Sequence, residues 1–334
     1  RRHMQRRPER VADMGEDRVT LSSPTFFHAP AADRLDRGRL GLIGVPFDAL
    51  STERRGSAEA PAALRRASHA VGQYRVSTGQ TIDWPRRLVD LGDVDANPFD
   101  PYSGFGPVRD AVAGALEAGG RPICIGGDHS LTYAAVTAAA AYSDLRLVQI
   151  DAHHDATDPD QWQCRYNHGT FVRNLVDDGR LAGPDVIQVG VRDFQWRDSG
   201  GRFLRDHGAQ LFAMADIDRD GLGPALDAIR AEPERPTYLT FDIDALDPAY
   251  APGTGEHMTA GLTAREATRL IRELFDGSIH IVAADLVELA PALDTTGRSL
   301  SLAAHLLALM ADGLSRDAVA AEAEAPPELQ KDRT

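Results

Sequence analysis

The sequence contains almost no lysine, little cysteine and no long apolar run. Lys331 is its only lysine, so nearly all of its positive charge is carried by arginine. Of the two cysteines, Cys124 lies inside an apolar run and Cys164 in a polar segment. This arrangement argues against a disulfide framework and fits a cytoplasmic protein. No apolar run approaches the roughly 20 residues that span a bilayer, so we expect no membrane partner.

The chain is acidic, with 334 residues and a formal net charge of −14. A surface of this sign repels phosphate backbones, which argues against a nucleic-acid partner. The basic residues 1–10 are not followed by an apolar segment, so they do not resemble a secretory signal. With 43% hydrophobic residues, the chain can form one large core or two smaller domains.

Short apolar runs alternate with longer segments of helical periodicity. Strands are predicted at residues 39–45, 87–92, 122–127, 145–151, 185–191, 209–214, 237–243 and 280–287. Helices are predicted at roughly 59–69, 107–119, 129–141, 201–207, 222–231, 263–275 and 297–313. Near-continuous apolar strands between helices indicate a mostly parallel sheet with helices on both faces.

No linker rich in Gly, Ser or Pro divides the patterned region. We therefore predict a single α/β domain of about eight strands over residues 26–313. Residues 1–25 are polar and irregular and are predicted to form a flexible N-terminal arm. Residues 314–334 are rich in Ala, Glu and Pro and are predicted to form a flexible acidic C-terminal tail.

Polar clusters follow four of the predicted strands. They read GGDH (126–129), DAHHD (151–155), DIDALDP (242–248) and VELAP (287–291). In parallel α/β sheets, ligands bind beyond the carboxyl ends of the strands. We therefore expect the four clusters to share one edge of the sheet.

Side chains in three of these clusters have the chemistry of metal ligands. Successive strand residues face opposite ways, so Asp151, His153 and Asp155 can converge on one point, as can Asp242 and Asp244. Four carboxylates at such a point would repel one another unless two divalent cations balanced them. The oxygen-rich set suits Mn²⁺ better than thiolate-preferring metals. Each motif alone also fits a helix cap or a turn, but their combination favours the metal site.

The same motifs resemble the signature blocks of the ureohydrolase family, which includes arginases, agmatinases, guanidinobutyrases, proclavaminate amidinohydrolases and formimidoylglutamases. The matching blocks are GGDHS (126–130), DAHHD (151–155) and FDIDALDPAYAPGTG (241–255). Residues 41–65 resemble the family's opening block, and the likeness covers most of residues 38–313. The resemblance implies an arginase-like three-layer α/β sandwich that assembles as a homotrimer or homohexamer.

The resemblance also implies a binuclear site with two Mn²⁺ ions, or with Ni²⁺ as the alternative metal. The implied assignment is His129 with Asp155 for one ion, His153 with Asp244 for the other, and Asp151 with Asp242 as bridges. A hydroxide held between the ions would be the nucleophile. His154 is better interpreted as an outer or packing histidine, and Asp158 as a turn residue.

Two further residues match catalytic positions of the family. Glu288 corresponds to the carboxylate that holds the guanidinium by paired hydrogen bonds. His168 corresponds to a histidine proposed to shuttle protons near the leaving group, a role that its pKa suits. Their alternatives are a surface glutamate and a loop histidine. The implied reaction is hydrolysis of a guanidino compound to urea and an amine.

The substrate is less closely defined. NHGTFVRN (167–174) resembles the agmatinase, guanidinobutyrase and proclavaminate amidinohydrolase branch, which disfavours arginine as the substrate. RYNHGTF (165–171) is closest to members that act on guanidino acids, so Arg165 is a candidate partner for a substrate carboxylate. Asn167 and Trp162 are further candidate contacts. A solvated arginine and a tryptophan at an oligomer contact are the alternatives.

The sequence departs from the family pattern in two places. EHMTAGL (256–262) stands where agmatinase-like members usually read TPEPGGL, and GSAEAP (56–61) stands where GARFGP is common. Glu256 and His257 are therefore candidate substrate contacts near the mouth of the site. The departures leave agmatine, a guanidino acid and guanidine itself as candidate substrates, and a nearby histidine leaves Ni²⁺ open.

Two other functions fit the same motifs less well. One is a hydrolase of formimino or amide C–N bonds on the same metals, which Glu288 and His168 disfavour. The other is a non-catalytic subunit that keeps the fold, which the six intact ligand positions disfavour. A nucleotide-binding protein is a weak further alternative, because no phosphate loop ending in GKS or GKT is present.

Overall fold

The computed structural model describes residues 24–97, 99–100, 102–140, 144–195 and 198–324, with side chains as far as Ser315. Most of the predicted N-terminal arm and the last ten residues of the predicted tail lie outside this part of the chain. Among the described helices, none combines the length and the apolarity that a membrane span requires.

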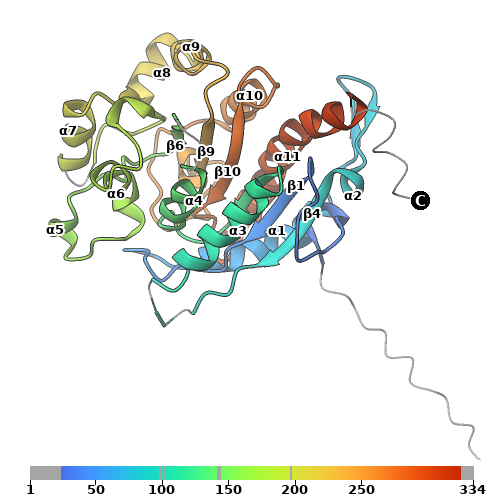
Figure 1. Cartoon of the computed structure of the whole chain (residues 1–334). Helices are drawn as coiled ribbons and strands as arrows, with labels where there is room; N and C mark the ends of the chain where they lie inside the picture. The colour runs from blue at the N-terminus through green and yellow to red at the C-terminus, as the bar shows by residue number, and fades with distance from the viewer. Residues whose placement is uncertain (1–23, 98, 101, 141–143, 196–197, 325–334) are drawn as a thin grey trace, which may run out of the picture.

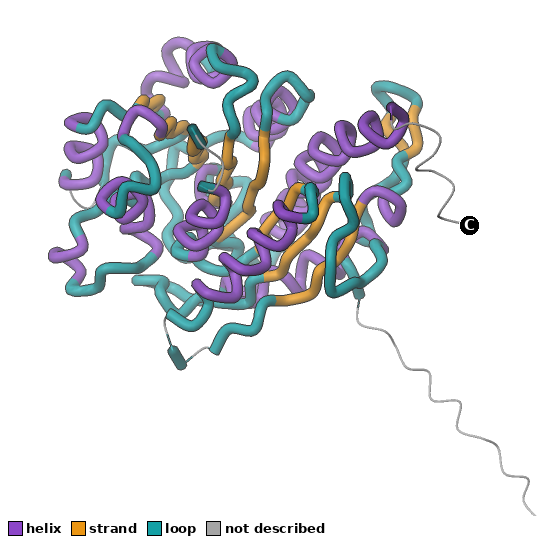
Figure 2. Tube along the Cα trace, in the orientation of Figure 1, coloured by secondary structure: helices purple, strands orange, loops and turns teal. Residues whose placement is uncertain are grey.

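The centre of the molecule is an eight-stranded sheet in which every neighbouring pair of strands is parallel. In spatial order its strands are β4 (Leu88–Asp93), β1 (Leu40–Gly44), β5 (Arg121–Ile125), β10 (Ile281–Val287), β9 (Thr237–Asp242), β6 (Arg146–Ile150), β7 (Val186–Val189) and β8 (Gln210–Phe212). All eight predicted strands are therefore confirmed. A separate two-stranded hairpin of β2 (Tyr74–Arg75) and β3 (Gln80–Thr81) was not predicted (Figure 2).

Helices cover both faces of the sheet (Figure 1). The α-helices are α1 (Ala60–Ser68), α2 (Trp84–Arg87), α3 (Phe105–Glu117), α4 (Leu131–Ala139), α5 (Pro159–Trp162), α6 (Phe171–Asp177), α7 (Ser199–Asp206), α8 (Met214–Asp220), α9 (Gly223–Arg230), α10 (Ala264–Leu274) and α11 (Arg298–Glu324). Short 3-10 helices occur at Phe26–His28, Ser57–Glu59, His168–Thr170, Gly183–Asp185, Ile243–Ala245 and Pro291–Leu293. The single-domain, three-layer α/β prediction is confirmed.

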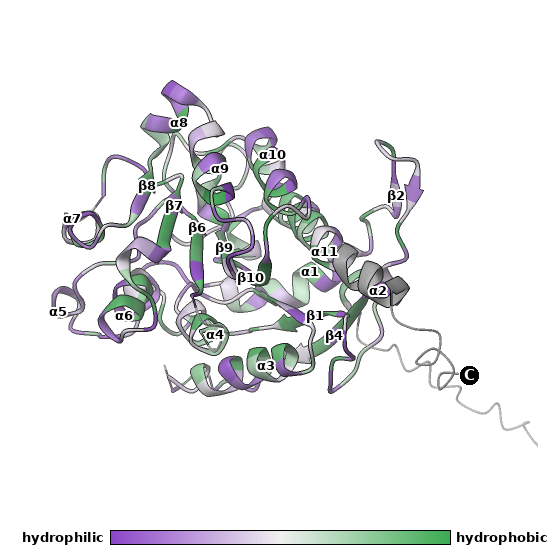
Figure 3. Cartoon of the chain, turned by 45° about the horizontal axis from the view of Figure 1, so that its top comes forward, coloured by the Kyte–Doolittle hydropathy of each residue, from purple (hydrophilic) through white to green (hydrophobic). Residues whose placement is uncertain are grey.

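The two cores follow from the alternation of side chains along the strands. Leu239 and Phe241 of β9 pack on one side with residues of α1, α10 and α11, whereas Tyr238 packs on the other with residues of α3, α4 and α6. In Figure 3, strands β4, β7 and β10 are largely green, the colour of hydrophobic residues. Because both faces of each central strand are buried, apolar residues occupy neighbouring as well as alternate positions of these strands.

Helix prediction was least accurate where helices are short or where composition suggested a tail. α2, α5, α6 and α8 were missed, since four to seven residues are too few to establish a period. α11 was predicted to end at residue 313 but continues to Glu324. The added segment, LSRDAVAAEAE (314–324), is rich in Ala and Glu, which are strong helix formers, so part of the predicted tail is helical.

The strand order brings the four polar clusters together. The chain passes from β5 to β6 across a gap of two strands, which β9 and β10 later fill. The four strands followed by polar clusters are thus the four adjacent central strands β5, β10, β9 and β6. Their carboxyl ends lie level, through the pairs Leu286 with Ile125, Val287 with Asp242, and Ile150 with Phe241.

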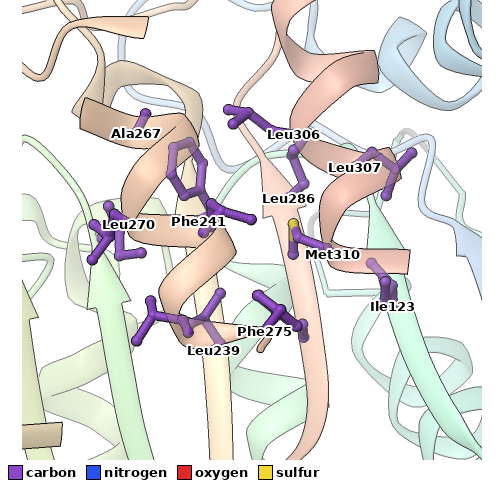
Figure 4. Close-up of a cluster of buried hydrophobic side chains, with 14 of the residues drawn as sticks. Ile123, Leu239, Phe241, Ala267, Leu270, Phe275, Leu286, Leu306, Leu307 and Met310 are labelled. Carbon is purple, nitrogen blue, oxygen red and sulfur yellow. The ribbon is translucent and has the colours of Figure 1, made fainter. Parts of the chain in front are cut away.

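Helix α10 offers a test of the core on one face of the sheet. Leu270 is fully buried among Leu239, Phe241 and Leu286 in the cluster of Figure 4. We expect Leu270→Ala to lower the free energy of unfolding by about 2–5 kcal/mol, since it removes buried methyl groups and leaves a cavity. Guanidinium chloride unfolding would measure this. The control Val76→Ala, at a side chain that is 85% exposed, should change stability by no more than about 0.5 kcal/mol.

Candidate metal centre and active site

His129 is placed by a tight turn at the end of β5. Gly126 and Gly127 both have positive φ, and a Cβ on Gly127 would lie 2.7 Å from the Phe47 carbonyl oxygen, so glycine is required there. The next residue, Asp128, accepts hydrogen bonds from the backbone N–H groups of Leu50 and Ser130. Burial, reinforced by the charge of Glu288, raises the pKa of Asp128 to about 6. The turn therefore fixes the histidine that follows it.

The hydrogen bonds of His129 define its tautomer. Thr240 Oγ1 donates to Asp285, at 2.5 Å, so it can only accept from His129 Nε2, which lies 2.8 Å away. Asp285 is held as an acceptor, since the hydroxyls of Thr132 and Tyr238 also donate to it. In the neutral ring, Nδ1 of His129 therefore carries the lone pair.

This nitrogen faces three carboxylate groups. Nδ1 of His129 is buried without a hydrogen-bond partner among the described residues. Carboxylate oxygens of Asp151, Asp155 and Asp242 lie 3.1, 2.9 and 3.0 Å from it. Although burial acts to lower it, the three carboxylates raise the pKa of His129 well above its ordinary value. A shared proton or a bound cation can therefore stabilise the group, and its nitrogen and oxygen donors fit a metal ion.

A second group adjoins the first and shares Asp151 with it. Nδ1 of His153 lies 2.9 Å from Asp244 Oδ2 and 3.6 Å from Asp151 Oδ1. Ligand atoms of Asp151, His153 and Asp244 all lie within 4.8 Å of one another, as do those of His129, Asp151 and Asp242. The structure thus brings together the six residues that the sequence suggested as ligands, in two groups that could hold two cations.

The carboxylates at this centre destabilise one another. Burial and the charges of Asp244 and Asp151 raise the pKa of Asp242 well above its ordinary value. Burial and the charge of Asp151 likewise raise the pKa of Asp155 to about 7. Asp155 also has a φ of 47°, a strained conformation for a non-glycine residue. Charge and backbone strain are therefore both concentrated at the same group.

A line of amides supports Asp151 from behind. Gln149 Nε2 donates to Asp151 Oδ2 at 2.6 Å, and Gln188 Nε2 donates to Gln149 Oε1 at 2.6 Å. Gln188 Oε1 in turn lies 2.7 Å from His154 Nδ1. His154 packs against Gly201 of α7, where a Cβ would lie 2.7 Å from its Nε2. This fits its interpretation as an outer histidine.

Glu288 and His168 lie side by side next to the metal groups. Glu288 Oε1 accepts from the backbone N–H of His129 at 2.8 Å and lies 2.9 Å from Nδ1 of His168. Glu288 has a φ of 62°, so its backbone is strained at the point where β10 ends. The carboxylate is thereby tied both to the turn that carries His129 and to the imidazole.

The other nitrogen of His168 meets both a donor and an acceptor. The Thr52 N–H donates to Nε2 at 3.0 Å, and Glu256 Oε1 lies 3.2 Å from the same atom. Although burial acts to lower it, the carboxylates of Glu256 and Glu288 raise the pKa of His168 well above its ordinary value. The neutral ring can thus be stabilised by Thr52 and the protonated ring by Glu256.

These groups surround a cavity of about 320 Å³, which is near the lower end for small-molecule sites. Asp242, Asp244 and Glu288 are buried at its floor, whereas Glu53 and Trp162 are exposed at its mouth. The full lining is Thr52, Glu53, His153, His154, Asp155, Thr157, Trp162, His168, Gly169, Gln195, Gly200, Asp242, Asp244, Thr254, Glu256 and Glu288. Neither Arg nor Lys is among these residues.

Three of the suggested substrate contacts lie elsewhere. Arg165, whose side chain is 55% exposed, forms an ion pair with Asp178 instead of lining the cavity. Asn167 caps its own loop, accepting from the Gly169 N–H and donating to a nearby carbonyl. His257 is exposed and contacts Arg54. Loop residues close in sequence to a site can point away from it, which spacing alone does not reveal.

Other residues of the site were not singled out from the sequence. Thr52 lies in the segment that resembles the family's opening block, but nothing in that segment marks it as a contact of His168. Gln149 and Thr240 lie two residues before Asp151 and Asp242 on the same strands. The two-residue spacing is a signal that could have identified them, since such residues share a face.

The comparisons with known proteins agree on one family. The model of the Arginase family matches residues 39–311. Mitochondrial agmatinase of Gallus gallus is 35% identical over 268 residues, which cover 80% of this chain and 78% of that protein. Guanidinopropionase of Pseudomonas aeruginosa is 33% identical over 301 residues, covering 88% and 94%. The solved structure of proclavaminate amidino hydrolase from Streptomyces clavuligerus superposes with a TM-score of 0.80 at 31% identity, covering 88% of this chain and 97% of that one.

A pair of unfolding measurements tests the metal groups. We expect Mn²⁺ at 100 times its Kd to stabilise the wild-type protein by about 2.7 kcal/mol through binding to the folded state. We expect Asp242→Asn to remove most of this gain. In EDTA the same variant should be at least as stable as the wild type, because it removes one of the mutually repelling carboxylates.

Thermal unfolding with Mn²⁺ and with EDTA would measure both effects. Asp160→Asn, at an exposed position on α5, is the matched control and should behave as the wild type in both solutions. A metal response that Asp242→Asn leaves intact would contradict the assignment.

Proposed function

The chain belongs to the arginase family, and from this we propose that it is a metal-dependent hydrolase that converts a guanidino compound and water into urea and an amine. The observation that carries the proposal is the position of Glu288 and His168, which lie 2.9 Å apart on the wall of the cavity that also exposes Asp242 and Asp244. A guanidinium-binding carboxylate, a proton carrier and two groups of metal ligands thus open into one small space.

We propose that two metal ions would be held by six residues, which are His129, Asp151, His153, Asp155, Asp242 and Asp244. The two ions are proposed to be Mn²⁺, with Ni²⁺ as the alternative. When bound, such a pair supplies Lewis-acid chemistry that lowers the pKa of water and polarises the substrate. The lone pair of His129 Nδ1, surrounded by three carboxylate oxygens, supports this assignment.

The role proposed for Glu288 is to orient the guanidinium. A planar guanidinium matches a carboxylate through two parallel hydrogen bonds, which fix direction as well as distance. Glu288 is buried, so its attraction for a cation is screened less than at the surface. Its strained backbone and its bond from the His129 N–H hold it in place before substrate binds.

The role proposed for His168 is to deliver a proton to the leaving amine. The departing nitrogen is a strong base and cannot leave as an anion, so a donor beside it is needed. His168 meets this need because Glu256 and Glu288 keep it protonated above the ordinary histidine range. After the transfer, Nε2 can accept the Thr52 N–H, so the neutral ring keeps a partner.

The assembly and the compartment also remain proposals. We propose a homotrimer or homohexamer, which the family resemblance supports, and a cytoplasmic location, which the low cysteine content supports. The cavity supports a small-molecule partner, and the acidic composition argues against nucleic acid.

A urea-release assay with Mn²⁺ and with Ni²⁺ tests the proposed reaction. The panel would include agmatine, 3-guanidinopropionate, 4-guanidinobutyrate, guanidine, arginine and formimidoylglutamate. We expect urea from at least one guanidino compound other than arginine, and none after EDTA treatment. Formamide released from the formimino compound alone would favour the related C–N hydrolase. No product from any member with the metal bound would indicate a non-catalytic subunit.

His168→Asn tests the proposed proton donor. We expect kcat to fall by about 10²–10⁴-fold with a small change in KM, because proton transfer affects the transition state more than binding. In the wild type, kcat should decline at high pH as the raised pKa of His168 is passed, since the protonated ring is the active form. A pH–rate profile would measure this. The same alkaline decline in His168→Asn would assign it to another group.

A further inference from the structure

The mouth of the cavity carries a carboxylate that belongs neither to the metal groups nor to the proposed guanidinium site. Glu256 is the first residue of the segment EHMTAGL (256–262). Its side chain is 22% exposed and lines the cavity. It is held by Thr52 Oγ1, which donates to its Oε1 at 2.6 Å. The charge is therefore fixed in place and not free to swing into solvent.

The backbone around Glu256 is also fixed. Arg54 Nε donates to the Gly255 carbonyl at 3.0 Å, and its NH2 group donates to the Thr254 carbonyl at 3.2 Å. A Cβ on Gly255 would lie 2.5 Å from the Arg54 carbonyl oxygen, so only glycine allows the two loops to approach this closely. The loop after β1 and the loop after β9 thus form one rigid rim.

Glu256 is ionised throughout the physiological range. Burial acts to raise its pKa, but the hydrogen bonds and charge of His168 together with Thr52 lower it to about 2. It lies across the imidazole of His168 from Glu288, with one carboxylate at each ring nitrogen. A guanidinium on Glu288 therefore leaves Glu256 facing the rest of the substrate.

The charged residues that line the cavity limit the charge that the rest of the substrate can carry. Two divalent cations would offset the four aspartates of the metal groups, but Glu53, Glu256 and Glu288 remain on the wall. A guanidinium and a protonated His168 offset two of these three charges. Arg165, the nearest sequence candidate for binding a carboxylate, is paired with Asp178 outside the cavity. A carboxylate on the substrate would therefore meet repulsion without a compensating cation.

We propose that Glu256 is a specificity-determining residue that excludes guanidino acids, so that the substrate is a guanidinium compound whose far end is neutral or cationic. This inference rests on the proposed function of the cavity but concerns its selectivity. It differs from the expectation that RYNHGTF and Arg165 favour an acidic substrate. It also gives a physical role to the segment 256–262, which places a fixed negative charge on the cavity wall.

The test uses three probes that share a guanidinium and a short alkyl chain: agmatine, butylguanidine and 4-guanidinobutyrate. Isothermal titration calorimetry on the metal-loaded protein would give Kd, and urea release would give kcat/KM. In the wild type, we expect 4-guanidinobutyrate to bind about 10–100-fold more weakly than butylguanidine, as expected for a like charge in a partly buried site. Agmatine should bind at least as tightly as butylguanidine.

The variants Glu256→Gln and Glu256→Thr remove the charge, and the first keeps an acceptor for Thr52. Both should reduce the discrimination against 4-guanidinobutyrate, measured as the ratio of Kd values, by about tenfold, while the Kd of butylguanidine changes little. The kcat of all three probes should fall together, because Glu256 no longer helps to keep His168 protonated. The controls Asp160→Asn and Arg165→Ala should leave the ratio unchanged. Circular dichroism and thermal unfolding would verify that each variant is folded.

The outcomes separate the inference from the proposed function. Selective binding that is lost in both Glu256 variants supports the inference even if no probe releases urea, in which case the proposed function fails. If the wild type releases urea and prefers 4-guanidinobutyrate to butylguanidine, the inference is overturned and the proposed function stands. The same holds if the ratio between these two probes is unchanged in the Glu256 variants. A ratio altered by Arg165→Ala and unaffected at Glu256 would assign selectivity to Arg165. Failure of all three probes to bind also overturns it.

Discussion

Four aspartates held within a few ångströms of two histidines are the constraint on which the rest of this structure depends. Burial and mutual repulsion raise the pKa of Asp242 and Asp155, and Asp155 is strained at its backbone as well. Such a cluster costs folding free energy, which protons on the two histidines or bound cations offset. The surrounding protein is consequently built to hold charges that would otherwise separate, and the stability of the fold is linked to occupancy of the site.

Hydrogen-bonding chains behind the ligands hold them in place. Asp285 and Thr240 orient His129, and Gln188 and Gln149 orient Asp151. Each chain runs across neighbouring strands, so the alignment of the sheet fixes the direction of the ligands. Packing helices on both faces keeps water from these chains, which strengthens them and makes any unpaired member costly. The rigid sheet therefore holds the candidate metal ligands in defined positions.

The mouth of the cavity is built from different elements than its floor. The floor is made of buried strand ends, whereas the mouth is made of two loops joined by Arg54, Thr52 and Glu256. His168 lies between the two zones, with Glu288 at one nitrogen and Glu256 at the other. A change in the loops can therefore alter the charge that the substrate meets, and the basicity of the proton carrier, without disturbing the ligands below.

The sequence by itself determined the strands, the layered fold and the set of candidate ligands. Apolar periodicity is imposed by burial, and ligand motifs such as DAHHD are local in the chain, so both can be read along it. Only the tertiary structure decided that β5, β10, β9 and β6 are neighbours, that Arg165 turns away to Asp178, and that Thr52 and Glu256 meet at His168. These contacts join residues up to 204 positions apart, and no local pattern encodes which distant loops will touch.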